Sequence, residues 1–93
     1  DFLMKNDKIK DVAVIGLPDK RLGEIEGAII EVKQGETLTE DEVNEFCLQL
    51  PRYKRPREII FAPVLRNATG KIEKPKLRGL YGQEHLVDFE NQD

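Results

Sequence analysis

Two short, mainly apolar segments constrain most strongly what this chain can fold into. They are "VAVIG" at residues 12–16 and "GAIIEV" at residues 27–32. Short apolar runs of this kind, rich in β-branched residues and flanked by turn residues, are typical of buried strands. The "LPD" that follows the first run, at 17–19, has the Pro and Asp of a turn. We therefore expect two buried strands joined by a turn.

A capping box predicts where the first helix begins. In "TEDE" (39–42) a Thr is followed three residues later by a Glu, and each of these side chains can accept a hydrogen bond from the backbone N–H of the other residue. Apolar side chains then recur on one helical face, and Pro51 ends the helix. These apolar residues are Val43, Phe46, Cys47 and Leu50.

The second half of the chain is expected to add a strand and a helix. "EIIFAPVL" (58–65) is typical of a strand, which Pro63 either ends or confines to a sheet edge. "KPKLRGLYG" (74–82) favours a short helix with Pro75 in its first turn. The mixture predicts an α+β fold with a small sheet of about three strands packed with helices. We expect the domain to span 1–82 and to be followed by a polar tail at 83–93.

Length and composition set the class of protein. A chain of 93 residues holds one domain at most. It contains no apolar run near the ~20 residues that a membrane span needs, and its N-terminus lacks the apolar core of a signal peptide. The lone Cys47 cannot form an internal disulfide, which favours a reducing compartment and predicts the cytoplasm. Because the chain opens at Asp1 and not at Met, we interpret it as a piece of a longer protein.

Charge is distributed unevenly along the chain. Residues 1–50 carry a net charge of −6, residues 51–79 carry +7, and residues 80–93 carry −4, within an overall −3. A positive block inside an acidic protein indicates a local anionic partner. The alternative interpretation is a solvated basic face with no ligand.

Three familiar kinds of site fail on inspection of the motifs. "ATGKI" (68–72) is not a P-loop, because Leu65 stands where that motif has its first Gly and Ile72 where it has Ser or Thr. The sequence has no metal-ligand spacing, so no metal site is predicted. The basic "RYKRPRE" (52–58) contains one aromatic residue and matches no nucleic-acid-binding signature, so no nucleic-acid partner is expected.

Four blocks in a fixed order carry a resemblance to a known family. They are "DVAVIGLPDKRLGE" (11–24), "LTEDEVNEFC" (38–47), "RYKRPREIIF" (52–61) and "RNATGKIEKPKLR" (66–78). In order and spacing the sequence resembles the C-terminal domain of adenylate-forming enzymes, which include acyl-CoA synthetases, luciferases and peptide-synthetase adenylation domains. The step from "RYKRP" to "NATGKIEKPKLR" is most similar to the acyl-CoA synthetase branch. The resemblance covers roughly residues 1–82.

The resemblance implies a catalytic lysine. Lys71 is implied to be the mobile lysine of the adenylation step, and Thr69 and Gly70 are implied to form the turn that presents it. In that step a carboxylic acid substrate attacks the α-phosphate of ATP, and one ammonium group can neutralise and align both reactants. Mg²⁺ is implied by the use of ATP but is not expected to be bound by this part of the chain.

The resemblance also implies a second half-reaction. After the domain rotates, another face helps to admit CoA, whose thiol displaces AMP. The residues implied to line that face or to attract the CoA phosphates are Gly23, Glu24, Arg52, Lys54, Arg55 and Arg57. Tyr53 and Pro56 are instead expected to pack beneath the sheet.

The implied partner is the large N-terminal domain of the same full-length chain. The hinge, the glycine-rich loop and that domain precede this region in the family and are not contained in these residues. Two alternatives stay open: the lid of an adenylation domain that loads a carrier protein, and a non-catalytic module that binds anions or other proteins. The identity of the carboxylic acid is not expected from these residues, because its pocket belongs to the other domain.

Overall fold

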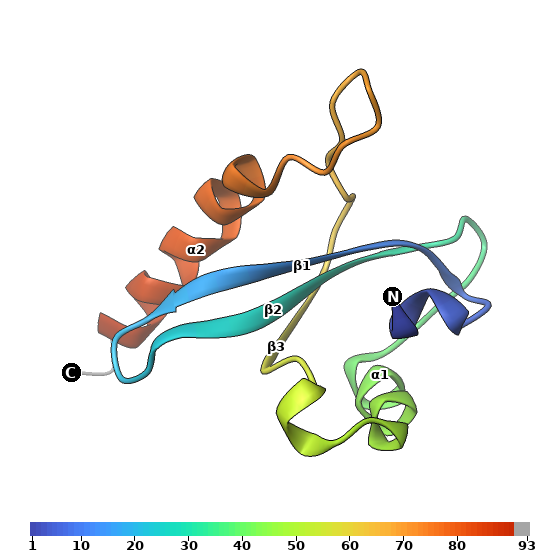
Figure 1. Cartoon of the computed structure of the whole chain (residues 1–93), viewed down its shortest axis with the longest axis horizontal. Coiled ribbons are helices and arrows are strands. Elements are labelled where there is room, and N and C mark those ends of the chain that lie inside the picture. Colours follow the sequence, from blue (N-terminus) through green and yellow to red (C-terminus); the bar gives the residue numbers. More distant parts are fainter. Residues whose placement is uncertain (91–93) are drawn as a thin grey trace.

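A three-stranded sheet forms the centre of the fold. The computed structural model describes the backbone of residues 1–90 and the side chains of residues 1–82. Strand β1 (Ile9–Asp19) pairs antiparallel with β2 (Gly23–Val32), and β2 pairs parallel with β3 (Glu58–Phe61), in the order β1-β2-β3 (Figure 1). The predicted α+β fold with about three strands is confirmed.

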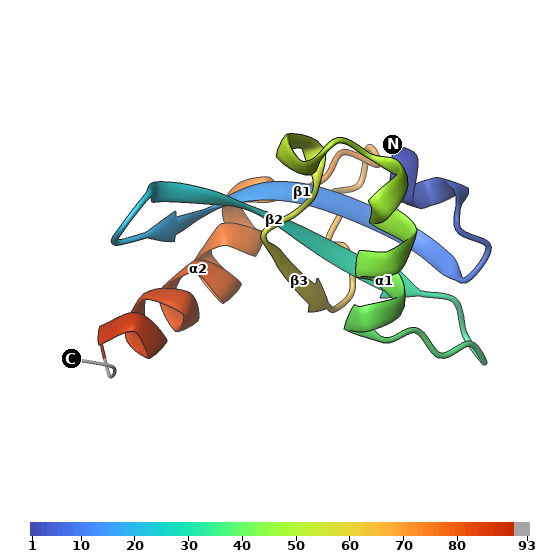
Figure 2. The same cartoon turned by 90° about the horizontal axis from the view of Figure 1, so that it is seen from below.

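Helices cover both faces of this sheet. Helix α1 lies on one face and α2 on the other, with the strands between them (Figures 1 and 2). Three short 3-10 helices, η1, η2 and η3, complete the fold. The bounds of the helices are Phe2–Lys5 for η1, Glu40–Phe46 for α1, Cys47–Gln49 for η2, Arg52–Lys54 for η3 and Lys74–Glu90 for α2.

The continuous apolar runs follow from this two-sided cover. Successive side chains of a strand point to opposite faces, so an uninterrupted apolar run is stable only where both faces are buried. On the α1 face, Val12, Ala28 and Ile30 pack with Val43 and Cys47 of the helical segment. On the α2 face the buried residues are Ala13, Ile15, Leu17, Ile25, Ile29, Val64 and Leu77.

The predicted capping box forms at the start of α1. The Thr39 hydroxyl accepts a hydrogen bond from the Glu42 backbone N–H at 3.2 Å, and a Glu42 carboxylate oxygen accepts one from the Thr39 N–H at 2.9 Å. Both bonds satisfy amide groups that a helix N-terminus otherwise leaves unpaired. The helix begins where the sequence predicts.

The turn between the first two strands is not where the sequence analysis placed it. "LPD" at 17–19 belongs to β1, with Leu17 fully buried and Pro18 opposite Glu24. Because β1 is an edge strand, a proline there breaks no sheet hydrogen bond. The reversal falls at 20–22, where the Asp19 carboxylate accepts hydrogen bonds from the N–H groups of the next turn, those of Arg21 and Leu22, both at 2.8 Å.

The chain beyond β3 crosses the α2 face of the sheet. As expected, β3 ends before Pro63 and lies at an edge. Val64 then donates its backbone N–H to a Glu31 carboxylate oxygen at 2.9 Å, and its side chain joins the core on that face. Helix α2 is longer than the predicted 74–82, since its backbone continues to Glu90. The predicted tail therefore starts inside this helix, residues 91–93 lie outside the described part, and the domain boundary at 82 stays a prediction.

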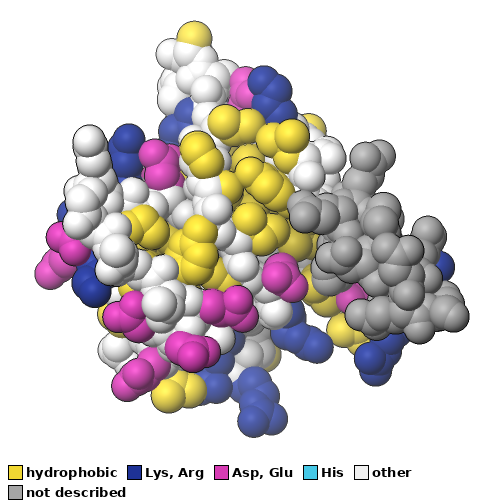
Figure 3. All heavy atoms as spheres, turned by 180° about the vertical axis from the view of Figure 1, so that it is seen from behind, with side chains coloured by type: hydrophobic (Ala, Val, Ile, Leu, Met, Phe, Trp, Pro, Cys, Tyr) yellow, Lys and Arg dark blue, Asp and Glu magenta, His cyan; other side chains and the backbone are white. Residues whose placement is uncertain are grey.

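Apolar side chains gather on the surface as well as in the core. From behind, they occupy the middle of the face, with acidic and basic side chains around them (Figure 3). Exposed large apolar residues elsewhere on the molecule include Leu48, Tyr53 and Leu80. Over the residues that the structure describes, no helix has the length and apolar character to cross a membrane.

Candidate functional site

The "NATGK" segment forms a tight turn at one end of the molecule. Arg66 and Ile72 form an isolated antiparallel bridge at its base. Between them, the Asn67 N–H donates to the Lys71 carbonyl and the Gly70 N–H donates to the Asn67 carbonyl, both at 2.9 Å. Gly70 has a φ of +85°, a backbone conformation that a residue with a Cβ rarely adopts. A glycine here therefore lets the chain reverse one residue before Lys71.

The Asn67 side chain holds this turn together from inside. Its Oδ1 accepts hydrogen bonds from the Thr69 N–H at 3.0 Å, the Thr69 hydroxyl at 2.7 Å and the Lys71 N–H at 2.9 Å. One amide oxygen thus ties down the backbone at two residues. Local bonds of this type are the reason that Asn favours turns.

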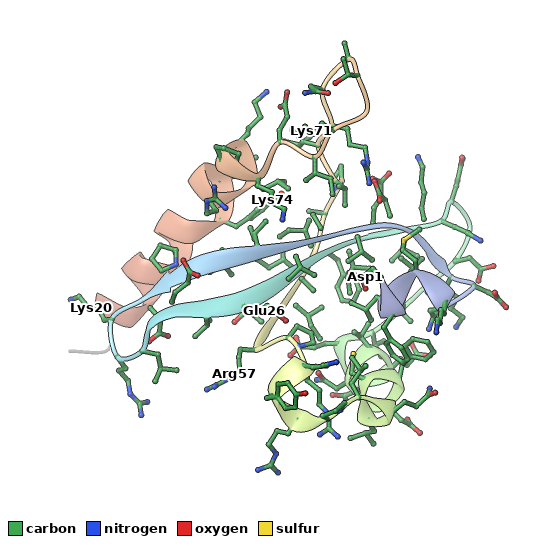
Figure 4. All side chains as sticks on the ribbon, in the orientation of Figure 1. Asp1, Lys20, Glu26, Arg57, Lys71 and Lys74 are labelled. Carbon is green, nitrogen blue, oxygen red and sulfur yellow. The ribbon has the colours of Figure 1, made fainter. Side chains whose placement is uncertain are left out.

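Lys71 leaves the turn exposed to solvent. Its side chain forms no hydrogen bond or ion pair with the residues that the structure describes. Figure 4 shows it at the upper end of the molecule, far from Glu26 and Arg57. The ammonium group is a charge on a long stem that a ligand can approach without first breaking an internal contact.

An ion pair joins the base of the turn to the sheet. Arg66 donates from Nε to Asp11 Oδ2 at 2.8 Å and from Nη2 to Asp11 Oδ1 at 2.9 Å, while its Nη1 donates to the Gly70 carbonyl at 2.6 Å. Asp11 belongs to β1, 55 residues earlier in the chain. The two parallel bonds to one carboxylate form the fork geometry in which arginine binds most specifically.

The Asp11 carboxylate makes stability depend on pH. Its hydrogen bonds with Arg66 hold the pKa of the Asp11 carboxyl below its usual value, and the same bonds raise the pKa of Arg66. A carboxyl whose pKa is lower in the folded than in the unfolded chain stabilises the fold above about pH 4, and this contribution disappears as the pH falls through the folded-state pKa.

We therefore expect the 93-residue chain to be more stable than its Asp11→Asn variant at pH 7, with a difference that shrinks on acidification below about pH 4. Urea denaturation at a series of pH values measures this difference, and carboxyl ¹³C NMR follows the Asp11 titration directly. Glu42→Gln serves as a control. The hydrogen bonds of the capping box lower the pKa of Glu42 as well, and this variant removes that second titration while Asp11 still titrates. An Asp11 carboxyl that titrates at its ordinary pKa contradicts the prediction.

The basic segment before β3 lines a groove on the α1 face. The groove has a volume of about 810 Å³ and is lined by Glu26, Arg52, Tyr53, Arg55 and Arg57. Arg55 is occupied with the backbone: its Nε lies 3.1 Å and 2.9 Å from the carbonyls of Cys47 and Leu50. Arg55 therefore caps the carbonyl groups at the end of the preceding helical segment. Arg52 and Lys54, which were also predicted to bind anions, are exposed.

The expectation that Tyr53 packs beneath the sheet is wrong. Its side chain is 81% exposed at the rim of the groove, and the Lys54 Nζ lies 5.9 Å from the centre of its ring. Tyr53 lies in the one-turn helix η3, which begins after Pro51, whereas α1 already ends at Phe46, before its predicted end at Pro51. Pro56 is half-buried and, like Tyr53, lines a second pocket with Val14 and Ala28, and its packing beneath the sheet stays a prediction.

The predicted pair at the start of β2 lies on the same face as the basic groove. Gly23, with a φ of +83°, completes the reversal after β1. Glu24 and Glu26 are two residues apart on β2, so both side chains lie on the same face of the sheet, the α1 face. The structure therefore brings Glu24 and the basic groove to one face and places the Lys71 turn elsewhere.

Sequence reasoning found the lysine turn but missed the residues that hold it. Asn67 belongs to the quoted motif, and its position in a turn was the available signal for its role. Asp11 lies inside a strand, and nothing in the neighbouring residues pairs it with Arg66. Only the packing of residues 62–73 across β1 and β2 brings these two side chains together.

Other reactive groups do not form a site. Within the described part of the chain, no group of three or more His, Cys, Asp or Glu residues could hold a metal ion. Cys47 is buried in the α1-face core, and this burial raises the pKa of its thiol. A buried thiol with a raised pKa is unreactive, which fits a packing role.

Comparison with known proteins gives consistent matches. The model of the AMP-binding enzyme C-terminal domain matches residues 1–71. The chain is 48% identical over 75 residues to the long-chain-fatty-acid–CoA ligase FadD13 of Mycobacterium tuberculosis, covering 78% of this chain and 15% of that protein. It is 43% identical over 77 residues to 4-hydroxybutyrate–CoA ligase 2 of Metallosphaera sedula, covering 82% of this chain and 14% of that protein.

A solved structure agrees with these matches. A fatty acyl CoA synthetase of Mycobacterium tuberculosis superimposes with a TM-score of 0.80 at 42% identity, over 89% of this chain and 17% of that one. The chain thus spans about a sixth of the length of the relatives it matches, at the level of both sequence and structure.

Proposed function

This chain belongs to the family of AMP-binding enzyme C-terminal domains, and from that premise we propose that it is the mobile lid of an ATP-dependent acyl-CoA synthetase. The observation that carries the proposal is the exposed turn that presents Lys71. The full-length enzyme first converts a carboxylic acid and ATP into acyl-AMP and pyrophosphate. The CoA thiol then attacks the acyl carbonyl and releases AMP.

Lys71 acts in the first half-reaction. As the carboxylate oxygen approaches the α-phosphate, negative charge accumulates around phosphorus, and an ammonium group placed between the two reactants stabilises it. Lysine suits this role because its charge is compact and its stem is long. The turn formed by Thr69 and Gly70, with Asn67 inside it, fixes where that stem begins. The absence of an ion pair between this ammonium and the side chains of residues 1–82 supports the proposal.

The α1 face serves the second half-reaction. Arg52, Lys54 and Arg57 provide positive charge near the groove, and CoA carries several phosphates. We assign Glu24 and Gly23 to the border of this face, where the carboxylate limits how far an anion can move along the sheet. Arg55 supports the groove from below through its bonds to backbone carbonyls. Because this groove and Lys71 lie in separate places, one rotation of the domain exchanges one for the other.

The remaining partners follow from the same proposal. The large N-terminal domain of the full-length chain supplies the pockets for ATP and the carboxylic acid, and the apolar surface seen from behind supports such a docking partner (Figure 3). In this proposal Mg²⁺ enters the active site bound to ATP. The lone buried Cys47 agrees with a cytoplasmic location.

The test is to incubate the full-length protein with ATP, Mg²⁺, CoA and a panel of carboxylic acids, and to measure pyrophosphate, AMP and acyl-CoA. Formation of acyl-CoA by the full-length protein supports the proposal. Activation of acids with transfer only to a carrier protein, and never to CoA, would replace the proposed acceptor. Failure to release pyrophosphate with every acid would remove the proposed chemistry altogether.

The 93-residue chain alone is expected to release no pyrophosphate above background. Lys71 by itself has no second reactant to align, because the proposed ATP and carboxylate pockets lie in the other domain. The same pyrophosphate assay measures this, with circular dichroism as a check that the chain is folded. Robust turnover by the folded 93-residue chain would show that the active site is complete without a second domain.

A further inference from the structure

Arg66 contacts both the sheet and the backbone beside Lys71 through hydrogen bonds. Its Nη1 donates to the carbonyl of Gly70, the residue directly before Lys71, at 2.6 Å. Its other two donors bind the two oxygens of Asp11 on β1 at 2.8 Å and 2.9 Å. A single planar group therefore joins the turn to a strand that is buried in the core.

A second contact fixes the base of the turn, where the side chain of Ile72, the residue directly after Lys71, packs against the α2-face core. The bonds made by Asn67 lie within the turn, so they fix its shape but not its direction relative to the sheet. The two backbone segments that flank the turn are joined to each other by a hydrogen bond, in which the Glu73 N–H donates to the Leu65 carbonyl at 2.9 Å. The direction in which Lys71 leaves the molecule thus depends on the Arg66–Asp11 pair on one side of the turn and on the Ile72 packing contact at its base.

We propose that Arg66 and Asp11 form a positioning pair, which aims Lys71 at the reacting phosphate during adenylation. This proposal rests on the proposed function of Lys71. Neither residue needs to touch the substrate. Asp11 holds the guanidinium plane in one orientation, and that plane in turn holds the Gly70 carbonyl, so the lysine stem starts from a fixed point.

A surface ion pair of this kind contributes little to stability, since both side chains keep part of their contact with water: Arg66 is 41% exposed and Asp11 18%. Its effect on rate is expected to be larger. A displacement of about 1 Å in a group that aligns reactants can cost up to about 100-fold in rate. The pair should therefore matter much more for catalysis than for folding.

The test uses the full-length protein and its two half-reactions. Arg66→Ala is expected to lower the kcat of acyl-AMP formation by about 10- to 100-fold, while thioesterification of preformed acyl-AMP changes by less than about twofold. Spared thioesterification also reports that the variant is folded. Lys76→Ala is the matched control, because Lys76 forms an ion pair with Glu73 at 3.3 Å that does not reach the turn.

Two further variants separate positioning from direct charge. Asp11→Asn removes a negative charge, so a purely electrostatic effect on anionic substrates would raise adenylation or leave it unchanged; positioning predicts a loss. Arg66→Lys keeps the charge but lacks the planar guanidinium that reaches both Asp11 oxygens and the Gly70 carbonyl, so positioning predicts that it does not restore the rate. Full adenylation activity of either variant would show that Arg66 and Asp11 do not position Lys71.

A double-mutant cycle links the pair to Lys71. If Arg66 acts through Lys71, adding Arg66→Ala to Lys71→Ala lowers adenylation no further. Additive losses show that Arg66 acts independently and overturn the inference. If Lys71→Ala reduces adenylation and Arg66→Ala does not, only the positioning pair is wrong. If Lys71→Ala is fully active, the proposed function of Lys71 fails and the pair fails with it.

Discussion

Replacing Lys71 with alanine in the full-length protein is expected to lower the rate of acyl-AMP formation by about 10²- to 10³-fold, the usual effect of losing one positioned group that stabilises developing charge. Thioesterification of preformed acyl-AMP should stay near the wild-type rate. The physical reason is that the ammonium stabilises charge that develops around the α-phosphorus, an atom whose own bonds change only in the first half-reaction; in the second, the bond that breaks joins the acyl carbon to a phosphate oxygen. Pyrophosphate release measures the first step, and acyl-CoA formation from supplied acyl-AMP measures the second.

Lys74→Ala is the matched control for this experiment. Lys74 is also exposed and lies three residues further along, at the first position of α2, so the two variants remove the same charge from almost the same region. A general loss of positive potential would weaken both variants alike. Equal losses in the two half-reactions of Lys71→Ala would mean that the lysine is not specific to adenylation.

Replacing Leu77 with alanine is expected to lower the free energy of unfolding by about 2–5 kcal/mol, the range measured when a buried leucine is truncated. Leu77 is the fully buried residue with which α2 joins the core on its face of the sheet, against Ile15, Leu17 and Ile29. Its loss removes apolar contacts and leaves a cavity that the surrounding strands cannot fill. Denaturant unfolding of the 93-residue chain measures the change.

Leu80→Ala provides the comparison on the same helix. Leu80 is 54% exposed, so its truncation should change the free energy of unfolding by no more than about 0.5 kcal/mol. Similar losses in the two variants would show that α2 does not dock on the sheet through Leu77. Because α2 starts three residues after Lys71, a helix that undocks in Leu77→Ala would also be expected to slow adenylation in the full-length protein.

Short-range patterns in the sequence predicted most of the elements. The two apolar runs, the capping box at Thr39 and the stop at Pro63 each correspond to an observed strand, helix start or strand end. These patterns are reliable because they reflect local chemistry: the alternation of side chains along a strand, the unpaired amides of a helix N-terminus, and the missing N–H of proline. One exception is "LPD", where burial of Leu17 in the core outweighed local turn preference and moved the reversal to 20–22. Another is the helical ends, since α1 ends at Phe46, before Pro51, and α2 runs on to Glu90.

By itself, the sequence determined the family resemblance, the α+β fold and the turn that carries Lys71, because each depends on residues close together in the chain. The tertiary structure alone decided what holds that turn and which charges are available. Arg66 meets Asp11 across 55 residues, and Arg55, although it lines the groove, uses its Nε to bind the carbonyls of a helical end. The physical reason is that the partner of a long charged side chain depends on which segments the buried core brings side by side, and no local pattern records that arrangement.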